Sequence, residues 1–203
     1  MLQVRIQDEA VAQLVAFGRF AAERGWVPAT SGNFSRRLDP NHIAVTRSGR
    51  DKGALSASDF AVVTLDQPLP PGVSAETPLH VGRYRRDPAI GAIVHVHSLA
   101  ATVLSRADQA KGTLDLEGFE MHKALAGFTT HESALRVPIF ANAQDTARLA
   151  DRIEAALGGW SAPGYLLAGH GLYAWGADVD EARRHVEAFD FLFRCALEER
   201  RMK

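Results

Sequence analysis

The chain has 203 residues, of which 46% are hydrophobic and 23% charged, a balance typical of a globular protein with one sizeable core. Its net charge of −1 shows no overall excess of basic residues, so we expect neither nucleic acid nor a membrane as a partner. The single cysteine, Cys195, excludes an intrachain disulfide framework and fits a reducing cytoplasm.

Hydrophobic periodicity predicts alternating helices and strands along the chain. Apolar residues at three- and four-residue steps predict a first helix over 8–24, with Asp8 as N-cap and Gly25 as its end. Short strands over 30–35 and 42–46, joined by a Pro/Asn turn, predict a hairpin. Further helices are expected over 77–86, 98–107, 116–125, 142–157 and 178–199, and further strands over 60–65, 92–98, 135–142, 164–168 and 171–175. This order predicts one α/β domain over 1–203, and the hairpin favours a mixed sheet.

Two histidines lie near the end of the strand predicted over 92–98. Side chains two apart on a strand point to the same face, so His95 and His97 project together. Neutral imidazoles are the commonest zinc ligands, and two on one strand are largely pre-oriented. The pair therefore indicates part of a metal site. The alternative is two structural histidines, each hydrogen-bonded to backbone.

Two other segments carry the residue types that bind phosphate. Ser31-Gly32-Asn33 opens the hairpin, and the run from Thr46 to Gly53, which contains Ser48, Gly49 and Lys52, follows its second strand. Hydroxyl residues, glycines and cations at a strand end can hold a phosphate through backbone N–H groups and charge. The alternative for either segment is an ordinary solvated loop. Neither has the glycine spacing of a nucleotide site.

A third histidine lies at the bend between the last two predicted strands. Gly169 and Gly171 flank His170, and they permit a tight backbone path that leaves the imidazole unobstructed. A structural turn histidine is the alternative. Beside the His-x-His pair, however, His170 is the candidate third ligand, and three histidines with an open position are typical of a catalytic zinc site.

Taken in order, these segments resemble the class II aldolase/adducin family of zinc-dependent sugar-phosphate enzymes. The resemblance spans nearly the whole chain and is carried by the first helix, Ser31-Gly32-Asn33, Thr46-Arg47-Ser48-Gly49, Glu76, His95-Val96-His97 and Gly169-His170-Gly171. It implies a three-layer α/β/α sandwich with a central mixed sheet. It also implies a homotetramer with its sites at subunit contacts.

The resemblance further implies a role for each matching residue. One zinc ion per subunit would be held by His95, His97 and His170. The substrate phosphate would be held by Ser31, Gly32, Asn33, Thr46, Ser48, Gly49 and Lys52. Glu120 would donate and accept protons, while Glu76 matches the carboxylate that aldolases of the family use at the metal. The chain thus holds two candidate acid/base residues.

Within the family, the segments 48–53, 120–123 and 141–145 are similar to a dehydratase branch. This similarity implies zinc-dependent loss of water from a methylthio-substituted ketose 1-phosphate, a cytoplasmic step of methionine salvage. One alternative is an aldolase or 4-epimerase acting on another ketose phosphate, such as fuculose 1-phosphate or ribulose 5-phosphate. A second is a non-catalytic, adducin-like interaction module, which has no need of three metal ligands.

Overall fold

The computed structural model describes residues 2–203, with side chains from residue 7 onward. Its α-helices are α1 (Leu2–Glu23), α2 (Thr77–Arg86), α3 (Leu99–Ala107), α4 (Thr146–Ala156) and α5 (Val179–Arg201). Its strands are β1 (Asn33–Asp39), β2 (His42–Thr46), β3 (Phe60–Thr64), β4 (Ala92–Val96), β5 (Thr113–Leu116), β6 (Leu135–Phe140), β7 (Gly164–Leu167) and β8 (Gly171–Gly176). Short 3₁₀ turns include η1 (Pro28–Thr30), η2 (Lys52–Ala54) and η5 (Glu120–Ala124).

The strands form one mixed sheet in the order β3-β2-β1-β4-β8-β7-β6-β5. Strands β1 and β2 make the predicted antiparallel hairpin, with Ser35 opposite Val45. Strands β6 and β7 run parallel, which requires a crossover connection, and α4 supplies it. The mixed sheet expected from the early hairpin is confirmed.

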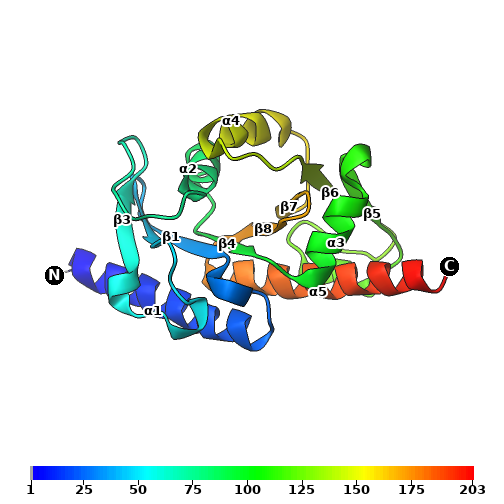
Figure 1. Ribbon diagram of the computed structural model, residues 1–203, viewed down its shortest axis with the longest axis horizontal. Coiled ribbons are helices and arrows are strands. Elements are labelled where there is room, and N and C mark those ends of the chain that lie inside the picture. The colour runs from blue at the N-terminus through cyan, green and yellow to red at the C-terminus, as the bar shows by residue number, and fades with distance from the viewer. Residues whose placement is uncertain (1) are drawn as a thin grey trace.

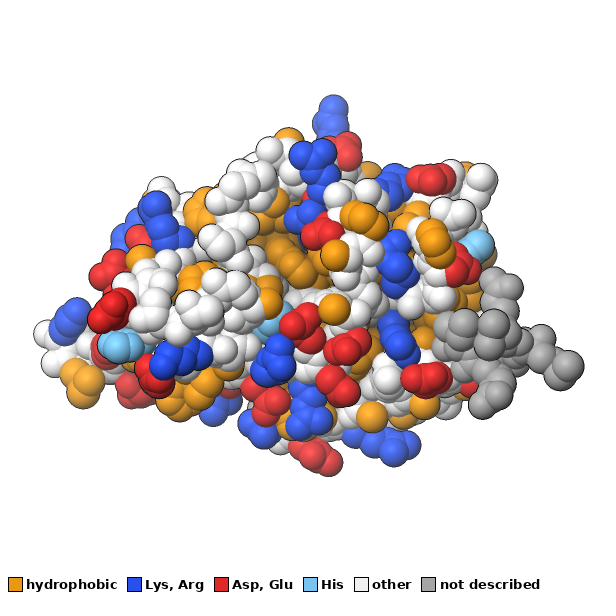
Figure 2. All heavy atoms as spheres, turned by 180° about the vertical axis from the view of Figure 1, so that it is seen from behind, with side chains coloured by type: hydrophobic (Ala, Val, Ile, Leu, Met, Phe, Trp, Pro, Cys, Tyr) orange, Lys and Arg blue, Asp and Glu red, His pale blue; other side chains and the backbone are white. Residues whose placement is uncertain are grey.

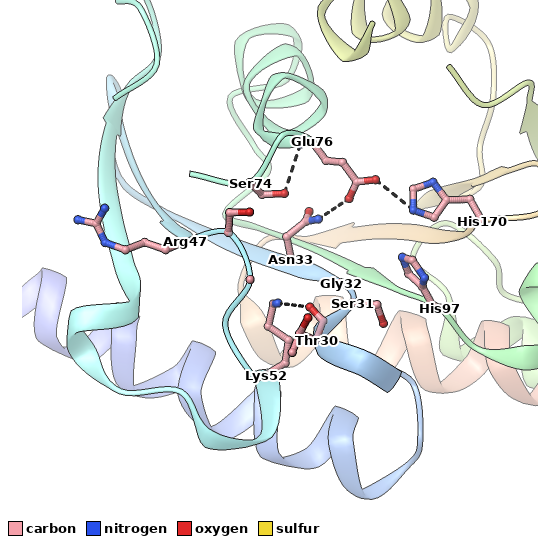
Figure 3. A pocket seen from close by; sticks show the side chains of 12 residues that line it. Thr30, Ser31, Gly32, Asn33, Arg47, Lys52, Ser74, Glu76, His97 and His170 are labelled. Carbon is pink, nitrogen blue, oxygen red and sulfur yellow. Dashed lines mark hydrogen bonds and ion pairs between the residues drawn. The ribbon is translucent and has the colours of Figure 1, made fainter. Parts of the chain in front are cut away.

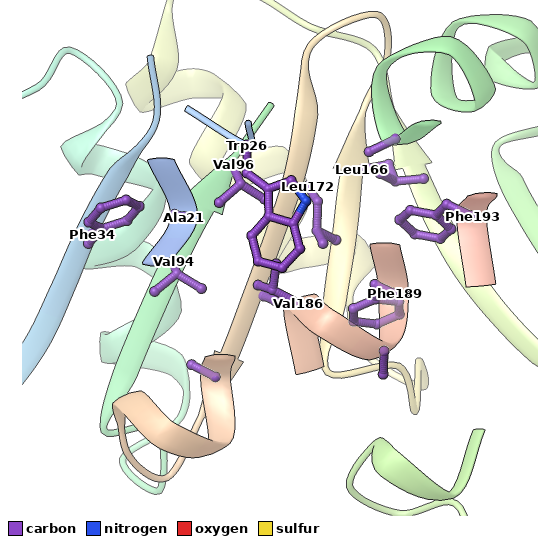
Figure 4. Packing of buried hydrophobic residues seen from close by; sticks show 14 of the residues in the cluster. Ala21, Trp26, Phe34, Val94, Val96, Leu166, Leu172, Val186, Phe189 and Phe193 are labelled. Atoms are coloured by element: carbon purple, nitrogen blue, oxygen red, sulfur yellow. The ribbon is translucent and has the colours of Figure 1, made fainter. Parts of the chain in front are cut away.

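Helices cover both faces of this sheet, with α1, α3 and α5 on one side and α2 and α4 on the other (Figure 1). Because side chains alternate along a strand, β4 serves both layers. Val94 and Val96 join the cluster under α1, α3 and α5, whereas Ile93 joins the cluster under α2 and α4. Figure 4 shows part of the first cluster, in which Phe189 and Phe193 of α5 stack with ring centroids 5.6 Å apart. The fold is the expected three-layer α/β/α sandwich.

Two expectations about individual elements were wrong. Helix α1 begins at Leu2, so Asp8 lies inside it and is not its N-cap. No glycine or proline lies between residues 2 and 8 to interrupt the helix. The segment 116–125 forms only the 3₁₀ turn η5, preceded by the unpredicted strand β5. Gly118, with a φ of 77°, is in the left-handed region and cannot continue a helix.

Charged side chains of both signs are interspersed over the face shown in Figure 2, with hydrophobic side chains at its hollowed centre. Among the helices that the structure describes, none has the length and apolar character needed to cross a membrane.

Candidate active site

His95 is held in the middle of the sheet, on the face that α2 and α4 cover. It lies opposite Asn33 of β1 and Tyr173 of β8. Its ring stacks on that of Tyr173, with centroids 4.0 Å apart and planes 14° from parallel. Its Nδ1 donates a hydrogen bond to the carbonyl of Leu172 at 3.0 Å, which leaves the lone pair of Nε2 for a ligand. The backbone thus fixes both the tautomer and the ring orientation.

The three predicted histidines converge through their ring nitrogens. Nε2 of His95 lies 2.8 Å from Nε2 of His97 and 3.3 Å from Nε2 of His170. Nitrogen ligands of a tetrahedral zinc ion lie roughly 3.3 Å apart, so this spacing fits a small divalent ion. Burial lowers the pKa of His95 well below its usual range and that of His97 to about 4. Both imidazoles are therefore neutral near pH 7, the form that binds metal.

The flanking glycines of His170 each meet a separate geometric need. Gly169 has a φ of 66°, a left-handed conformation that turns the chain between β7 and β8. At Gly171 a β-carbon would lie 2.3 Å from the carbonyl oxygen of Val96 and 3.2 Å from Cε1 of His95. This position admits no side chain because β8 passes close to β4 beside the histidines. The prediction that glycines allow a tight path here is confirmed.

Glu76 lies beside the histidines, at the N-terminus of α2. It occupies the N-cap position, but its side chain makes no capping hydrogen bond. Instead Oε1 lies 3.0 Å from Nε2 of His170 (Figure 3). Oε2 lies 3.5 Å from Nε2 of His95. The Asn33 amide donates to Oε2. Burial by itself raises the pKa of Glu76, but His170, His95 and Asn33 outweigh it, so the pKa lies well below its ordinary value. The ionised carboxylate is placed to be a further ligand or a base.

A cavity of about 180 Å³ opens in front of Glu76 and the histidines. Its wall comes from the two predicted phosphate segments, the segment that leads into α2, and the metal-site residues. The lining residues are Thr30, Ser31, Gly32, Asn33, Arg47, Ser48, Gly49, Lys52, Ser74, Glu76, His97 and His170. Hydroxyl groups, glycines and cations thus lie next to the histidines, as a sugar phosphate would require.

Lys52 connects the two phosphate segments. Its side chain is buried, and its Nζ donates to the carbonyl oxygens of Thr30 and Arg50, both at 2.7 Å. Burial lowers the pKa of Lys52, an effect that the charges of Asp51 and Glu76 partly offset. The bond to Thr30 also holds a strained turn, because Thr30 has a φ of 63° without being glycine. Lys52 therefore fixes the shape of the cavity as well as its charge.

Two predicted residues lie elsewhere. Thr46 is fully buried behind the cavity wall, where its Oγ1 accepts the backbone N–H of Phe34 at 3.1 Å. Glu120 lies on η5 with 69% of its side chain exposed and is not among the lining residues. It pairs with the Lys123 ammonium, which lowers the pKa of Glu120, and lies 3.3 Å from Nδ1 of His131. Within one chain, the carboxylate next to the histidines is that of Glu76.

Sequence reasoning missed three lining residues, Thr30, Arg47 and Ser74. Thr30 directly precedes Ser31, so extending that motif by one position would have found it, whereas Arg47 lies inside the predicted 46–53 segment, between Thr46 and Ser48. Ser74 lies two residues before Glu76 and its Oγ accepts the backbone N–H of Glu76 at 3.2 Å. Only the approach of the 72–76 segment to the hairpin reveals that residue.

Curated relatives match almost the full chain. A methylthioribulose-1-phosphate dehydratase of Xanthomonas campestris pv. campestris (strain 8004) is 52% identical over 195 residues, covering 94% of this chain and 89% of the relative. The methylthioribulose-1-phosphate dehydratase of Sorangium cellulosum (strain So ce56) is 50% identical over 195 residues, covering 94% and 92%.

Solved structures and a family model agree with this relationship. The crystal structure of l-fuculose-1-phosphate aldolase from Thermus thermophilus is similar to this chain with a TM-score of 0.79 and 28% identity, covering 96% of both chains. The structure of YgbL from Klebsiella pneumoniae, a putative aldolase/epimerase/decarboxylase by its own description, has a TM-score of 0.73 and 26% identity, covering 95% and 90%. The model described as the class II aldolase and adducin N-terminal domain matches residues 12–197. The chain therefore belongs to the class II aldolase and adducin N-terminal domain family.

Proposed function

We propose that this protein dehydrates 5-methylthioribulose 1-phosphate to 5-methylthio-2,3-dioxopentyl 1-phosphate and water, as a cytoplasmic enzyme of methionine salvage. The observation that carries the proposal is the identity of 50–52% to methylthioribulose-1-phosphate dehydratases over about nine-tenths of both chains. The converging histidines, the adjacent carboxylate and the polar cavity support it with the groups that such a reaction needs.

The metal proposed for this site is zinc, one ion per subunit. Nε2 atoms of His95, His97 and His170 would hold it, and their spacing fits a small divalent ion, as does the neutral state of His95 and His97. When bound, such an ion supplies a positive charge that polarises the ketone oxygen at C2 of the substrate.

The phosphate end of the substrate is proposed to lie against the two segments that Lys52 holds together. Ser31 and Ser48 line the cavity, and the buried ammonium group of Lys52 adds positive charge. These groups would fix the reacting carbons beside the histidines. Correct positioning of this kind can lower a barrier by several kcal/mol.

Two carboxylates are proposed to move the protons. One carboxylate takes the proton from C3 of the substrate. A carboxyl group in its protonated form then gives a proton to the C4 hydroxyl, which leaves as water. The resulting enol takes a proton at C4 and becomes the 2,3-diketone. Glu120 is proposed as the principal proton carrier and Glu76 as its assistant. Since Glu120 is exposed and outside the cavity of its own chain, we propose that it acts across a subunit contact of a homotetramer.

One structural observation favours the second candidate, an aldolase or 4-epimerase acting on another ketose phosphate. Glu76 is the carboxylate that lies at the histidines within the chain, and l-fuculose-1-phosphate aldolase is similar in fold. Purified protein incubated with 5-methylthioribulose 1-phosphate and analysed by mass spectrometry distinguishes the two. The dehydratase gives a product lighter by one water and no cleavage products. Cleavage of fuculose 1-phosphate, with no product from methylthioribulose 1-phosphate, would establish the aldolase instead.

A further inference from the structure

A line of buried polar side chains runs behind Glu76, away from the cavity. Tyr84 OH lies 3.0 Å from Ser35 Oγ, and Ser35 Oγ lies 2.7 Å from Nδ1 of His80. Nε2 of His80 contacts Oδ1 of Asn33, whose Nδ2 donates to Oε2 of Glu76. The four residues behind Glu76 are at most 2% exposed.

Two regular elements supply these residues in register. Glu76, His80 and Tyr84 are four residues apart, so they form one stripe along α2 and its N-cap. Asn33 and Ser35 are two apart on β1 and therefore share one face of that strand. The stripe of α2 lies over this face, which brings each α2 side chain against a β1 side chain.

The chemistry of the groups sets the direction of every hydrogen bond in the line. The Glu76 carboxylate oxygen accepts from Nδ2 of Asn33, which turns the Oδ1 of that amide toward His80. That oxygen also only accepts, so Nε2 of His80 must carry the proton. Nδ1 then accepts from the Ser35 hydroxyl, and Ser35 accepts from Tyr84. Each donor has one acceptor, and reversal of one bond would leave two acceptors or two donors facing each other.

We propose that His80 is a positioning residue for the reaction: as the neutral Nε2–H tautomer, it fixes the Asn33 amide and thereby the orientation of the Glu76 carboxylate beside the substrate. The inference rests on the proposed dehydration for its kinetic readout only. His80 does not line the cavity and contacts the carboxylate only through Asn33. Both ends of the Asn33 amide are engaged, by Glu76 and by His80, so the phosphate would be held by other lining residues such as Ser48 and Lys52. Loss of His80 should therefore impair turnover and leave those phosphate contacts and the three histidine ligands unchanged.

Two substitutions separate positioning from packing. His80→Gln places an amide N–H near the position of Nε2 and can still donate to Asn33. His80→Asn is shorter, can still reach Ser35, and loses the bond to Asn33. With 5-methylthioribulose 1-phosphate as substrate, we expect His80→Asn to lower kcat roughly 10- to 100-fold, the usual effect of losing an outer-shell partner, with KM and bound zinc nearly unchanged. His80→Gln should retain most of the wild-type kcat.

If His80→Asn and His80→Gln lose kcat equally, His80 contributes through packing and not through its hydrogen bond to Asn33. If both variants keep the wild-type kcat, His80 has no role in turnover. A readout independent of activity is the ¹⁵N NMR spectrum of the zinc-loaded protein, with the His80 signals assigned from their absence in His80→Gln. We expect the neutral Nε2–H tautomer, and an Nδ1–H tautomer would overturn the inference. If the wild-type protein does not turn over 5-methylthioribulose 1-phosphate, the proposed dehydration is refuted but the role of His80 is not. The tautomer of His80 in the NMR spectrum would then test that role.

Discussion

Oε1 of Glu76 lies 3.0 Å from Nε2 of His170, whereas the side chain of Glu120 is 69% exposed and pairs with Lys123. The two candidate acid/base residues thus have very different surroundings in one chain. The carboxylate of Glu76 is fixed by buried neighbours, while that of Glu120 lies at the surface beside Lys123 and His131. Replacing each glutamate by glutamine, which keeps the size of the side chain and removes its charge, can show which of the two is the acid/base.

Glu120→Gln should keep zinc and KM while lowering kcat at least roughly 100-fold, because removal of a general acid/base costs about that much. Glu132→Gln, an exposed carboxylate nearby in sequence, is the control and should retain full activity. The measurement is steady-state kinetics with zinc quantified in each preparation. If Glu76→Gln loses turnover while Glu120→Gln retains it, Glu76 is the acid/base and an aldolase-type reaction gains support.

Subunit complementation can locate Glu120. If it acts across a subunit contact, refolding Glu120→Gln together with His95→Ala should restore activity that neither variant has, since mixed oligomers then contain some intact sites. If mixed oligomers are no more active than the separate variants, Glu120 acts in the site formed by the histidines of its own chain.

His95→Ala should abolish both zinc binding and turnover. Two remaining imidazoles make a poor site, and His95 is the residue whose Nε2 lies nearest to both others. Metal analysis of the dialysed protein checks this, with His42→Ala as control because His42 lies on β2 and pairs with Asp39 instead. Full zinc content with normal activity in His95→Ala would refute the metal site.

Ser48→Ala should raise KM about tenfold while leaving kcat within about twofold, because a hydrogen bond to a phosphate is made equally in the ground and transition states. Ser48 lines the cavity, whereas the exposed Ser58 on η3 (Ala57–Asp59) does not, so Ser58→Ala is the matched control. A loss confined to kcat would contradict a phosphate-binding role for Ser48.

Gly171→Ala should weaken zinc binding and destabilise the fold by roughly 1–3 kcal/mol, the usual effect of overpacking. The new methyl group would meet the Val96 carbonyl at 2.3 Å and would press on His95. Gly158→Ala is the control, since nothing lies within 4 Å of a β-carbon there. Urea unfolding and zinc titration measure the two effects, and equal behaviour of the two variants would show that β8 can shift away from β4 at little cost.

His80 should make the protein sensitive to acid. Burial lowers the pKa of His80 from 6.5 to about 4, so its neutral form favours the folded state. This stabilisation is fully present above pH 6.5 and is lost as the pH falls through about 4. We expect the free energy of unfolding of the metal-free wild type to fall by roughly 3 kcal/mol more than that of His80→Gln between these pH values. Parallel curves from urea unfolding at each pH would contradict it.

The sequence by itself determined most of the elements and the three histidines of the candidate metal site. The period-2 placement of His95 and His97 and the glycines around His170 identified three histidines that the fold does bring together. These signals are local, since strand alternation and glycine flexibility act over a few residues. The β1–β2 hairpin was predictable for the same reason. The predicted helix over 116–125 was wrong, because hydrophobic periodicity does not register the left-handed backbone at Gly118.

Only the tertiary structure decided which side chains share the site. Glu76 meets His170 because α2 packs over the sheet, and the His80–Asn33 contact depends on the same packing. Thr46 and Ser48 are two residues apart on one predicted segment, yet one is buried behind the wall and the other lines the cavity. Such distinctions arise from the relative placement of elements far apart in sequence. Burial and long-range hydrogen bonds set that placement, and no local pattern in the sequence encodes it.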